Sequence, residues 1–325
     1  MNLLRSAGYA FVPLLMTLVG AATAHAQTFP SKAVRLIVPY APGGSVDVLA
    51  RAMADPLQER LGHPVVVENK AGAGGAIGGE ATAKATADGH TLLITGSGAI
   101  TVSPHLNKLS YDPVKDLAPV SMVATLPIVV AVHPSLPVRS IAELVALAKS
   151  QPGKLNFSSN GLGSVSFLAA ELLKKTSGIN MVHVVYRGAA PGAAAVAAGE
   201  VQVGFIDSTA IMPQARAGAV RALAVTDPQR SNIVPDLPTV AESGVAGYAV
   251  RSWVGLFAPR ATPDEVVARL NADVTQVLRQ PAMRERMLQA QMEPAPGSVD
   301  EFARYVAAET NTWRDVIKEA GIKGN

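Results

Sequence analysis

The sequence has no cysteine among its 325 residues. The chain therefore cannot form disulfides, thiolate metal sites, cysteine nucleophiles or a lipid-modified N-terminal cysteine. Aromatic residues make up only 5% of the chain, which argues against the stacking surfaces that bind single-stranded nucleic acid. Hydrophobic residues make up 49%, so the chain is not intrinsically disordered and we expect it to bury a sizeable core.

Charged residues are also few, at 16%, and neither sign dominates. There are 28 Lys and Arg residues and 25 Asp and Glu residues, and the longest basic run is the pair Lys174-Lys175. Such a chain offers no basic patch to a phosphate backbone, so nucleic acid is excluded as its main partner. The six His residues are scattered, with no two at metal-ligand spacing on one helix, and we expect no metal site.

The sequence signatures of common enzyme classes are missing. There is no Gly-x-Ser-x-Gly motif and therefore no nucleophile elbow. Gly153-Lys154 lacks the Gly-rich lead and the Ser or Thr of a P-loop, and no Gly-x-Gly pair continues into a full dinucleotide fingerprint. We predict no catalytic residues and no cofactor, and a hydrolase or transferase is only a remote alternative.

Residues 1–26 have the pattern of a secretory signal peptide. Arg5 is the only charge before an apolar stretch from about Ala10 to Ala22, and Ala24-His25-Ala26 provides a small-x-small cleavage pattern. The apolar stretch is shorter than the roughly 20 residues that span a bilayer, although an N-terminal membrane anchor is the alternative. We expect a mature chain that begins near Gln27, is not membrane-embedded and is located in the periplasm.

The rest of the chain alternates short apolar runs with helical patterns, which is typical of parallel α/β structure. The run Val34–Val38 is nearly continuous in apolar residues, as in a strand that is covered on both faces. Ser140 and Thr262 each precede a helical pattern with Glu three residues later, so a capping box is predicted at both, and Ser298–Glu301 is expected to open the last helix. Further strands are predicted at 65–67, 92–95, 129–132, 156–159, 181–185, 201–206, 222–225 and 253–257.

The order strand, Gly-rich turn, helix occurs near residue 43 and again near residue 161. This repetition predicts two α/β lobes that face each other. Because no flexible linker separates them, we place the boundary at strands that cross near Pro127 and Arg251. The predicted division is a signal peptide at 1–26, a first lobe of 27–127 plus 251–325, and a second lobe of 128–250.

Four Gly-rich turns follow predicted strands: Pro42–Ser45, Gly72–Gly75, Gly96–Gly98 and Asn160–Ser164. A turn that opens a helix leaves backbone N–H groups unpaired, and the helix dipole favours an anion there. Ligands of open α/β sheets bind at this edge. For any one turn, the alternative is that glycine only allows the turn conformation. The four turns together predict a polar cleft that binds an anion.

Two polar residues of these turns allow two interpretations each. In one interpretation, Asp47 contacts ligand-bound water or an ammonium group. In the other, it is a first-turn acid that pairs with Arg51 four residues later. For Ser164, one interpretation is that its hydroxyl donates to the ligand, and the other is that it only caps the following helix. We expect the anion to be held mainly by backbone N–H groups of Gly43, Gly44, Gly161 and Gly163, helped by the hydroxyls of Ser45 and Ser164.

The run from Pro39 to Asp47, continued by Ala50-Arg51, resembles the opening of the Bug receptors. These are the periplasmic solute-binding proteins of tripartite tricarboxylate transporters. The resemblance covers nearly all of the chain after residue 26. It continues through Val67–Gly75, Asp88–Leu93, Asp112–Leu117, Asn156–Ser164, Tyr186–Gly188, Arg221–Thr226 and Trp253–Pro259.

The resemblance implies a non-catalytic receptor with the two-lobed Venus-flytrap fold of periplasmic binding proteins, type II-like. It implies delivery of a small carboxylate-bearing ligand to the membrane permease subunits of such a transporter. In this family one turn from each lobe grips the carboxylate, here Pro42–Asp47 and Asn160–Ser164, with Asp207-Ser208-Thr209 nearby. The implied ligand-binding residues are Pro42, Gly43, Gly44, Ser45, Asp47, Asn160, Gly161, Gly163, Ser164, Asp207 and Ser208.

The sequence departs from the family at one position and leaves the ligand open. The family often carries a His shortly after the second Gly-Ser, where this chain has Phe167. Either the ligand is more apolar or this side chain points into the core. Family ligands range from dicarboxylates to amino acids and aromatic acids, so the resemblance names none of them. A ligand-sensing protein that acts on a signalling receptor would have the same cleft and is the alternative function.

Overall fold

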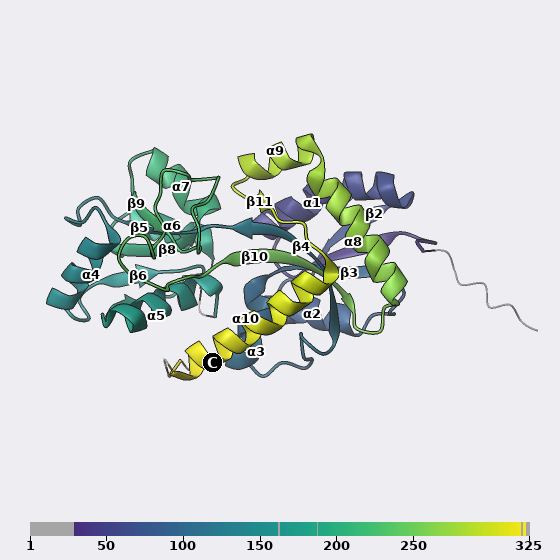
Figure 1. Ribbon diagram of the computed structural model, residues 1–325, viewed down its shortest axis with the longest axis horizontal. Helices are drawn as coiled ribbons and strands as arrows, with labels where there is room; N and C mark the ends of the chain where they lie inside the picture. Colours follow the sequence, from purple (N-terminus) through teal and green to yellow (C-terminus); the bar gives the residue numbers. More distant parts are fainter. Residues whose placement is uncertain (1–28, 162, 187, 320, 323–325) are drawn as a thin grey trace, which may run out of the picture.

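The computed structural model describes residues 29–322, apart from 162, 187 and 320, and the predicted signal peptide lies outside these residues. Two α/β lobes lie side by side, and each is built on its own sheet (Figure 1). The prediction of a two-lobed α/β fold is therefore confirmed. Within the described part of the chain, no helix has both the length and the apolar character needed to cross a membrane.

The first sheet has six strands in the order β11-β4-β10-β3-β1-β2. Strand β1 pairs in parallel with β2 on one side and with β3 on the other, whereas β10 runs antiparallel to β3 and β4. The strands are β1 (Val34–Val38), β2 (Val65–Asn69), β3 (Thr91–Gly96), β4 (Leu117–Leu126), β10 (Ser252–Pro259) and β11 (Glu293–Pro294).

Helices cover both faces of this sheet. One face packs against α1 (Ser45–Leu61), α8 (Asp264–Arg279) and α9 (Pro281–Gln289). The other face packs against the first half of α10 (Val299–Glu319) and the segment that holds α2 (Ala76–Ala83). In β1, Leu36 and Val38 belong to the first core and Ile37 to the second, which explains the continuous apolar run.

The second sheet has five strands in the order β7-β6-β8-β5-β9. Its strand β5 is fully buried, with Ile128, Val130 and Val132 in one core and Val129 and Ala131 in the other. Helices α4 and α5 pack on the first of these cores, and α6 and α7 on the second. The elements are β5 (Ile128–Val132), α4 (Ile141–Ser150), β6 (Asn156–Ser158), α5 (Val165–Ser177), β7 (Val182–His183), α6 (Ala189–Ala197), β8 (Val203–Asp207), α7 (Ser208–Arg216) and β9 (Arg221–Val225).

The chain changes sheet twice. Strand β4 of the first sheet continues into β5 of the second through Pro127 alone. The return occurs between β9 and β10, where the Arg251 guanidinium lies 3.5 Å from the Asp227 carboxylate. These are the places at which the proposed division sets the lobe boundaries.

Helix α10 is shared by the two lobes. Near its beginning, Phe302 and Val306 pack in the core of the first lobe with Trp253. Near its end, Trp313 and Ile317 belong to the core of the second lobe. Figure 1 shows the helix running from the first lobe toward α5, and Lys175 of α5 forms an ion pair with Glu319. The boundary at residue 251 therefore does not separate all contacts of the two lobes.

The local predictions hold in most places but fail in two. Ser140 accepts a hydrogen bond from the N–H group three residues later, as predicted, and Ser298 does the same at the predicted start of α10. The Thr262 hydroxyl has no partner among the described residues, so the box predicted there is wrong: α8 begins one residue later, with Pro263 at its N-cap position. Strand β4 was not predicted because Pro119 interrupts its apolar pattern, and Pro119 lies next to a register irregularity with β10.

Candidate ligand-binding cleft

A cleft of about 750 Å³ lies between the two lobes. The first lobe lines it with the turn before α1 and with the short helix η2 (Gly98–Val102) that follows β3. The second lobe lines it with the first residues of α5, α6 and α7. The predicted site residues that line it are Gly43, Gly44, Ser45, Asn160, Gly163, Ser164 and Asp207.

The turn between β1 and α1 presents backbone donors to this cleft. Gly44 is the N-cap residue of α1, and no side chain caps the helix. Gly43 has a φ of +86°, a value that glycine adopts without strain. The N–H groups of a first helical turn have no intrahelical partners, so those that follow Gly44 are available to an anion.

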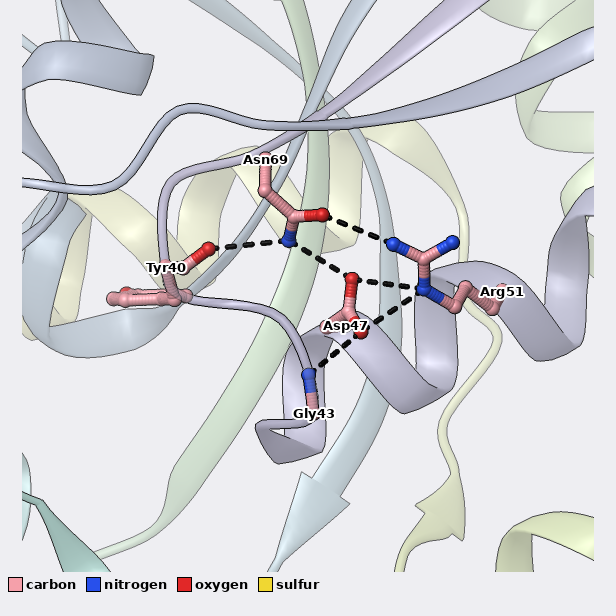
Figure 2. Close-up of polar contacts among 5 residues, drawn as sticks. All are labelled: Tyr40, Gly43, Asp47, Arg51 and Asn69. Atoms are coloured by element: carbon pink, nitrogen blue, oxygen red, sulfur yellow. Dashed lines mark hydrogen bonds and ion pairs between the residues drawn. The ribbon is translucent and has the colours of Figure 1, made fainter.

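The carboxylate of Asp47 is committed to the turn itself, not to the cleft (Figure 2). It accepts hydrogen bonds from the Gly43 N–H at 2.9 Å, from Asn69 Nδ2 at 2.9 Å and from Arg51 Nε at 3.0 Å. Asn69 also donates to the Tyr40 carbonyl. Burial would raise the pKa of Asp47, but the hydrogen bonds from Arg51, Gly43 and Asn69 lower it to about 2.

The predicted pairing of Asp47 with Arg51 is therefore present, and Asp47 is not among the residues that line the cleft, so its contact with a ligand stays a prediction. The side chain is 2% exposed and fixes the conformation of the turn. Pro42 is exposed and does not line the cleft either. The first predicted turn thus contributes Gly43, Gly44 and Ser45 to the cleft, with Asp47 behind them as a support.

The turn before α5 uses its hydroxyl groups internally. Ser164 Oγ accepts from the Phe167 N–H at 3.1 Å and donates to the Gly161 carbonyl at 2.7 Å, so it is an N-cap. Ser166 Oγ accepts from the Asn160 N–H at 2.8 Å. These bonds hold the turn before α5 in its conformation.

Of the four expected glycine donors, only two have an N–H without a partner in the described part of the chain. The Gly43 N–H is taken by Asp47 and the Gly161 N–H by Ser159 Oγ. Those of Gly44 and Gly163 have no hydrogen-bond partner among the described residues. Gly44 and Gly163 come from different lobes, so an anion between them would contact both.

The two lobes approach each other closely beside these donors. A Cβ atom placed on Gly98 would lie 3.5 Å from the Gly163 carbonyl oxygen and 3.8 Å from the Ser164 Cα. Gly98 opens η2 in the first lobe, whereas Gly163 and Ser164 precede α5 in the second. A Cβ atom at position 98 would thus make ordinary van der Waals contact with the second lobe.

Asp207 lies at the junction of β8 and α7 and lines the cleft. Its Oδ1 is buried and has no hydrogen-bond partner among the described residues. Burial raises the pKa of this carboxyl to about 6, against a hydrogen bond from the Asn160 side chain that lowers it. The neighbouring Ser208 does not line the cleft, because its buried hydroxyl donates to the Gln291 carbonyl at 3.3 Å.

Phe167 packs into the core of the second lobe. It is 5% exposed, and its ring centroid lies 4.7 Å from that of His183. Burial and the nearby Lys174 lower the pKa of His183 to about 4. Of the two interpretations of Phe167, the core position is the one the structure shows.

Several lining residues were not predicted from the sequence. Tyr40 lies two residues before Pro42, and Trp253 lies two residues after Arg251, so proximity in sequence to a predicted turn or crossing was a usable signal. Ala290 and Met292 lie between α9 and β11, and only tertiary packing brings them to the cleft. Together with Val46 and Val165, these side chains give the cleft apolar walls.

The ionisable side chains of the cleft are few. Of the described lining residues, only Asp207 and Tyr40 are ionisable, and none is a Lys, Arg or His. Nor do three His, Asp or Glu side chains gather as a metal site anywhere in the described part of the chain. The cleft can thus bind an anion through backbone N–H groups and an apolar body through its walls.

Comparison with known proteins gives a consistent set of matches. The family described as "Tripartite tricarboxylate transporter family receptor" matches residues 49–322. BugT of Bordetella pertussis is 36% identical over 308 residues, which cover 93% of this chain and 94% of BugT. The solved structure of R. palustris Rpa4515 with adipate is 37% identical, with a TM-score of 0.82 over 91% of this chain and 100% of that one. MatC from Rhodopseudomonas palustris with bound malate is 33% identical, with a TM-score of 0.78 over 89% of this chain and 100% of MatC.

Proposed function

Because this chain belongs to the tripartite tricarboxylate transporter receptor family, we propose that it is a periplasmic receptor that captures a small carboxylate between its two lobes. It then delivers the ligand to the membrane subunits of such a transporter. The resemblance to the Bug receptors is confirmed by the family match and by BugT. Adipate and malate in the structural relatives support a carboxylate as the ligand here.

The observation that carries the proposal is the pair of unpaired N–H groups on opposite sides of the cleft. Gly44 of the first lobe and Gly163 of the second both line the cleft, and the N–H of each has no hydrogen-bond partner among the described residues. A carboxylate that accepts from both would hold the lobes together. The same geometry supports the role of Asn160, Gly161, Ser164 and Asp47 as residues that shape the two turns.

Calorimetry on the mature chain tests ligand capture. We expect one equivalent of a small carboxylate to bind, with no product formed over long incubation, since the proposed receptor is not an enzyme. A ligand at about 100 times its Kd should raise the free energy of unfolding by about 2.7 kcal/mol, so a thermal-shift screen finds candidates first. Steady turnover of a bound acid, or no binding across di- and tricarboxylates, amino acids and aromatic acids, would contradict the proposal.

Uptake measurements in the host cell test delivery. Deleting the gene should abolish uptake of the acid that binds in calorimetry, and re-expression of the full chain should restore it. If uptake is unchanged while a transcriptional response to the acid is lost, the chain is a sensor and the transport proposal is wrong.

A further inference from the structure

Asp207 occupies an N-cap position but does not cap its helix. Asp is among the best N-cap residues, because its carboxylate can accept from the first free N–H groups of the helix. At the start of α7 no side-chain cap bond is made. Ser164, at the equivalent position of α5, makes that bond with the Phe167 N–H. The Asp207 carboxylate thus accepts no hydrogen bond from the first N–H groups of α7, and Asp207 lines the cleft.

A second acceptor lies beside it. Asn160 lines the cleft, and its Oδ1, like Oδ1 of Asp207, is buried without a hydrogen-bond partner among the described residues. The nearby Tyr40 hydroxyl is already bonded to Thr95 Oγ1 at 3.1 Å. Buried polar atoms in folded proteins are nearly always paired, so these two acceptors call for a donor that the described residues do not supply.

We propose that Asp207 and Asn160 recognise a hydrogen-bond donor on the ligand, and that the ligand is therefore an amino- or hydroxy-substituted carboxylic acid. This rests on the proposed carboxylate receptor and specifies its substrate class. The carboxylate of the ligand binds the N–H groups of Gly44 and Gly163, and its donor faces the two acceptors. The cleft is thus divided into a donor side and an acceptor side.

An ammonium group satisfies this arrangement better than a hydroxyl group. Hydrogen bonds between oppositely charged groups are shorter and roughly twice as strong as neutral ones. A second carboxylate in place of the donor would meet two acceptors and a like charge. We therefore expect the order amino acid, then hydroxy acid, then plain dicarboxylate in affinity.

Matched ligand sets give a direct test. The probes are aspartate, malate and succinate; glutamate, 2-hydroxyglutarate and glutarate; and 6-aminohexanoate, 6-hydroxyhexanoate and adipate. In the set that fits the cleft, the amino acid should bind at least about tenfold more tightly than the unsubstituted dicarboxylate of the same length, which is succinate, glutarate or adipate. If the dicarboxylate binds as tightly in every set, this inference is wrong and the carboxylate receptor stands. If no probe of any class binds, the proposed function itself fails.

The variant Asp207→Asn tests the assignment to this residue. It should weaken binding of the preferred amino acid at least about tenfold while leaving or strengthening binding of the dicarboxylate. Asp55→Asn, the same chemical change on the exposed face of α1, is the matched control and should change neither. An unchanged preference in Asp207→Asn would overturn the inference. Because Asn has nearly the shape of Asp, thermal unfolding should show an intact fold.

The sign of the pH dependence separates the two modes of binding. The only other described ionisable group at the cleft is Tyr40, whose pKa is raised by burial and also by Asp207. An ammonium group requires ionised Asp207, so affinity for the amino acid should fall as the pH drops through about 6, and Asp207→Asn should remove that fall. If affinity rises as the pH drops, a protonated Asp207 donates to a ligand carboxylate, and the inference is wrong.

Arg187 precedes the lining residue Gly188 in sequence and supplies a final control. Arg187→Gln should keep the preference for the amino acid over the dicarboxylate. If the preference is lost in Arg187→Gln but retained in Asp207→Asn, it does not originate at Asp207, and the inference is overturned.

Discussion

The indole Nε1 of Trp253 donates a 2.7 Å hydrogen bond to Oε2 of Glu309. Trp253 is the second residue of β10, the strand by which the chain returns to the first lobe, and it lines the cleft. Glu309 lies on α10, the helix that packs on both lobes. This bond therefore connects the wall of the cleft to the helix that the lobes share.

Glu309 should make the stability of the fold depend on pH. Burial raises its pKa from 4.5 to about 7, against hydrogen bonds from Trp253 and three other side chains. The folded state then binds the Glu309 proton more tightly than the unfolded state does. The stabilisation of the fold by protonated Glu309 is therefore lost as the pH rises from about 4.5 through 7. Relative to the wild type, Glu309→Gln should gain more in the free energy of unfolding near pH 8 than near pH 5. Denaturant titrations at both pH values measure this, and an equal difference at the two would contradict it.

Ser164→Ala should reduce stability more than it reduces affinity. The Ser164 hydroxyl caps α5 and accepts the Phe167 N–H, and loss of such a cap costs about 1 kcal/mol. Ser140→Ala removes the corresponding cap of α4, which does not line the cleft, and is the matched control. Both variants should unfold at lower denaturant, and calorimetry should show binding within a few-fold of wild type. A loss of binding specific to Ser164→Ala, beyond about tenfold, would place its hydroxyl on the ligand.

Ligand binding should close the lobes about the crossings near Pro127 and Arg251. An acid that contacts Gly44 and Gly163 joins opposite sides of the cleft, and such receptors close by hinge motion. Small-angle scattering with saturating ligand should give a smaller radius of gyration than without ligand. An unchanged radius at proven saturation would indicate a rigid pocket.

The sequence was informative where a local pattern determines the structure. Glycines followed by a helical pattern predicted the turns before Ser45 and Val165, because only a few residue types permit such turns. The apolar runs predicted most strands of both sheets, since strands covered on both faces carry almost no polar residues. The alternating cores of β5 show the same effect.

The sequence was uninformative where distant segments meet. The amphipathic pattern of α10 predicts a helix, but it does not say that Trp313 packs in the other lobe. Single-residue roles depend on side-chain direction as well: Asp47 and Asp207 both lie at helix starts, yet one supports a turn and the other faces the cleft. No spacing rule separates these two cases.

The central claim is that backbone N–H groups, and not the guanidinium of Arg51, hold the carboxylate. Gly44 has φ −75° and ψ 166°, and a Cβ there would lie 3.7 Å from the Ala41 carbonyl oxygen, so Gly44→Val should fold normally while its side chain blocks the donor. The most direct test is the calorimetric Kd of one acid for the wild type, Gly44→Val and Arg51→Gln, with folding checked by circular dichroism. We expect Gly44→Val to weaken binding at least about tenfold and Arg51→Gln to change it only a few-fold, because Arg51 pairs with Asp47 and Asn69. Loss of binding in Arg51→Gln with full binding in Gly44→Val would contradict this account.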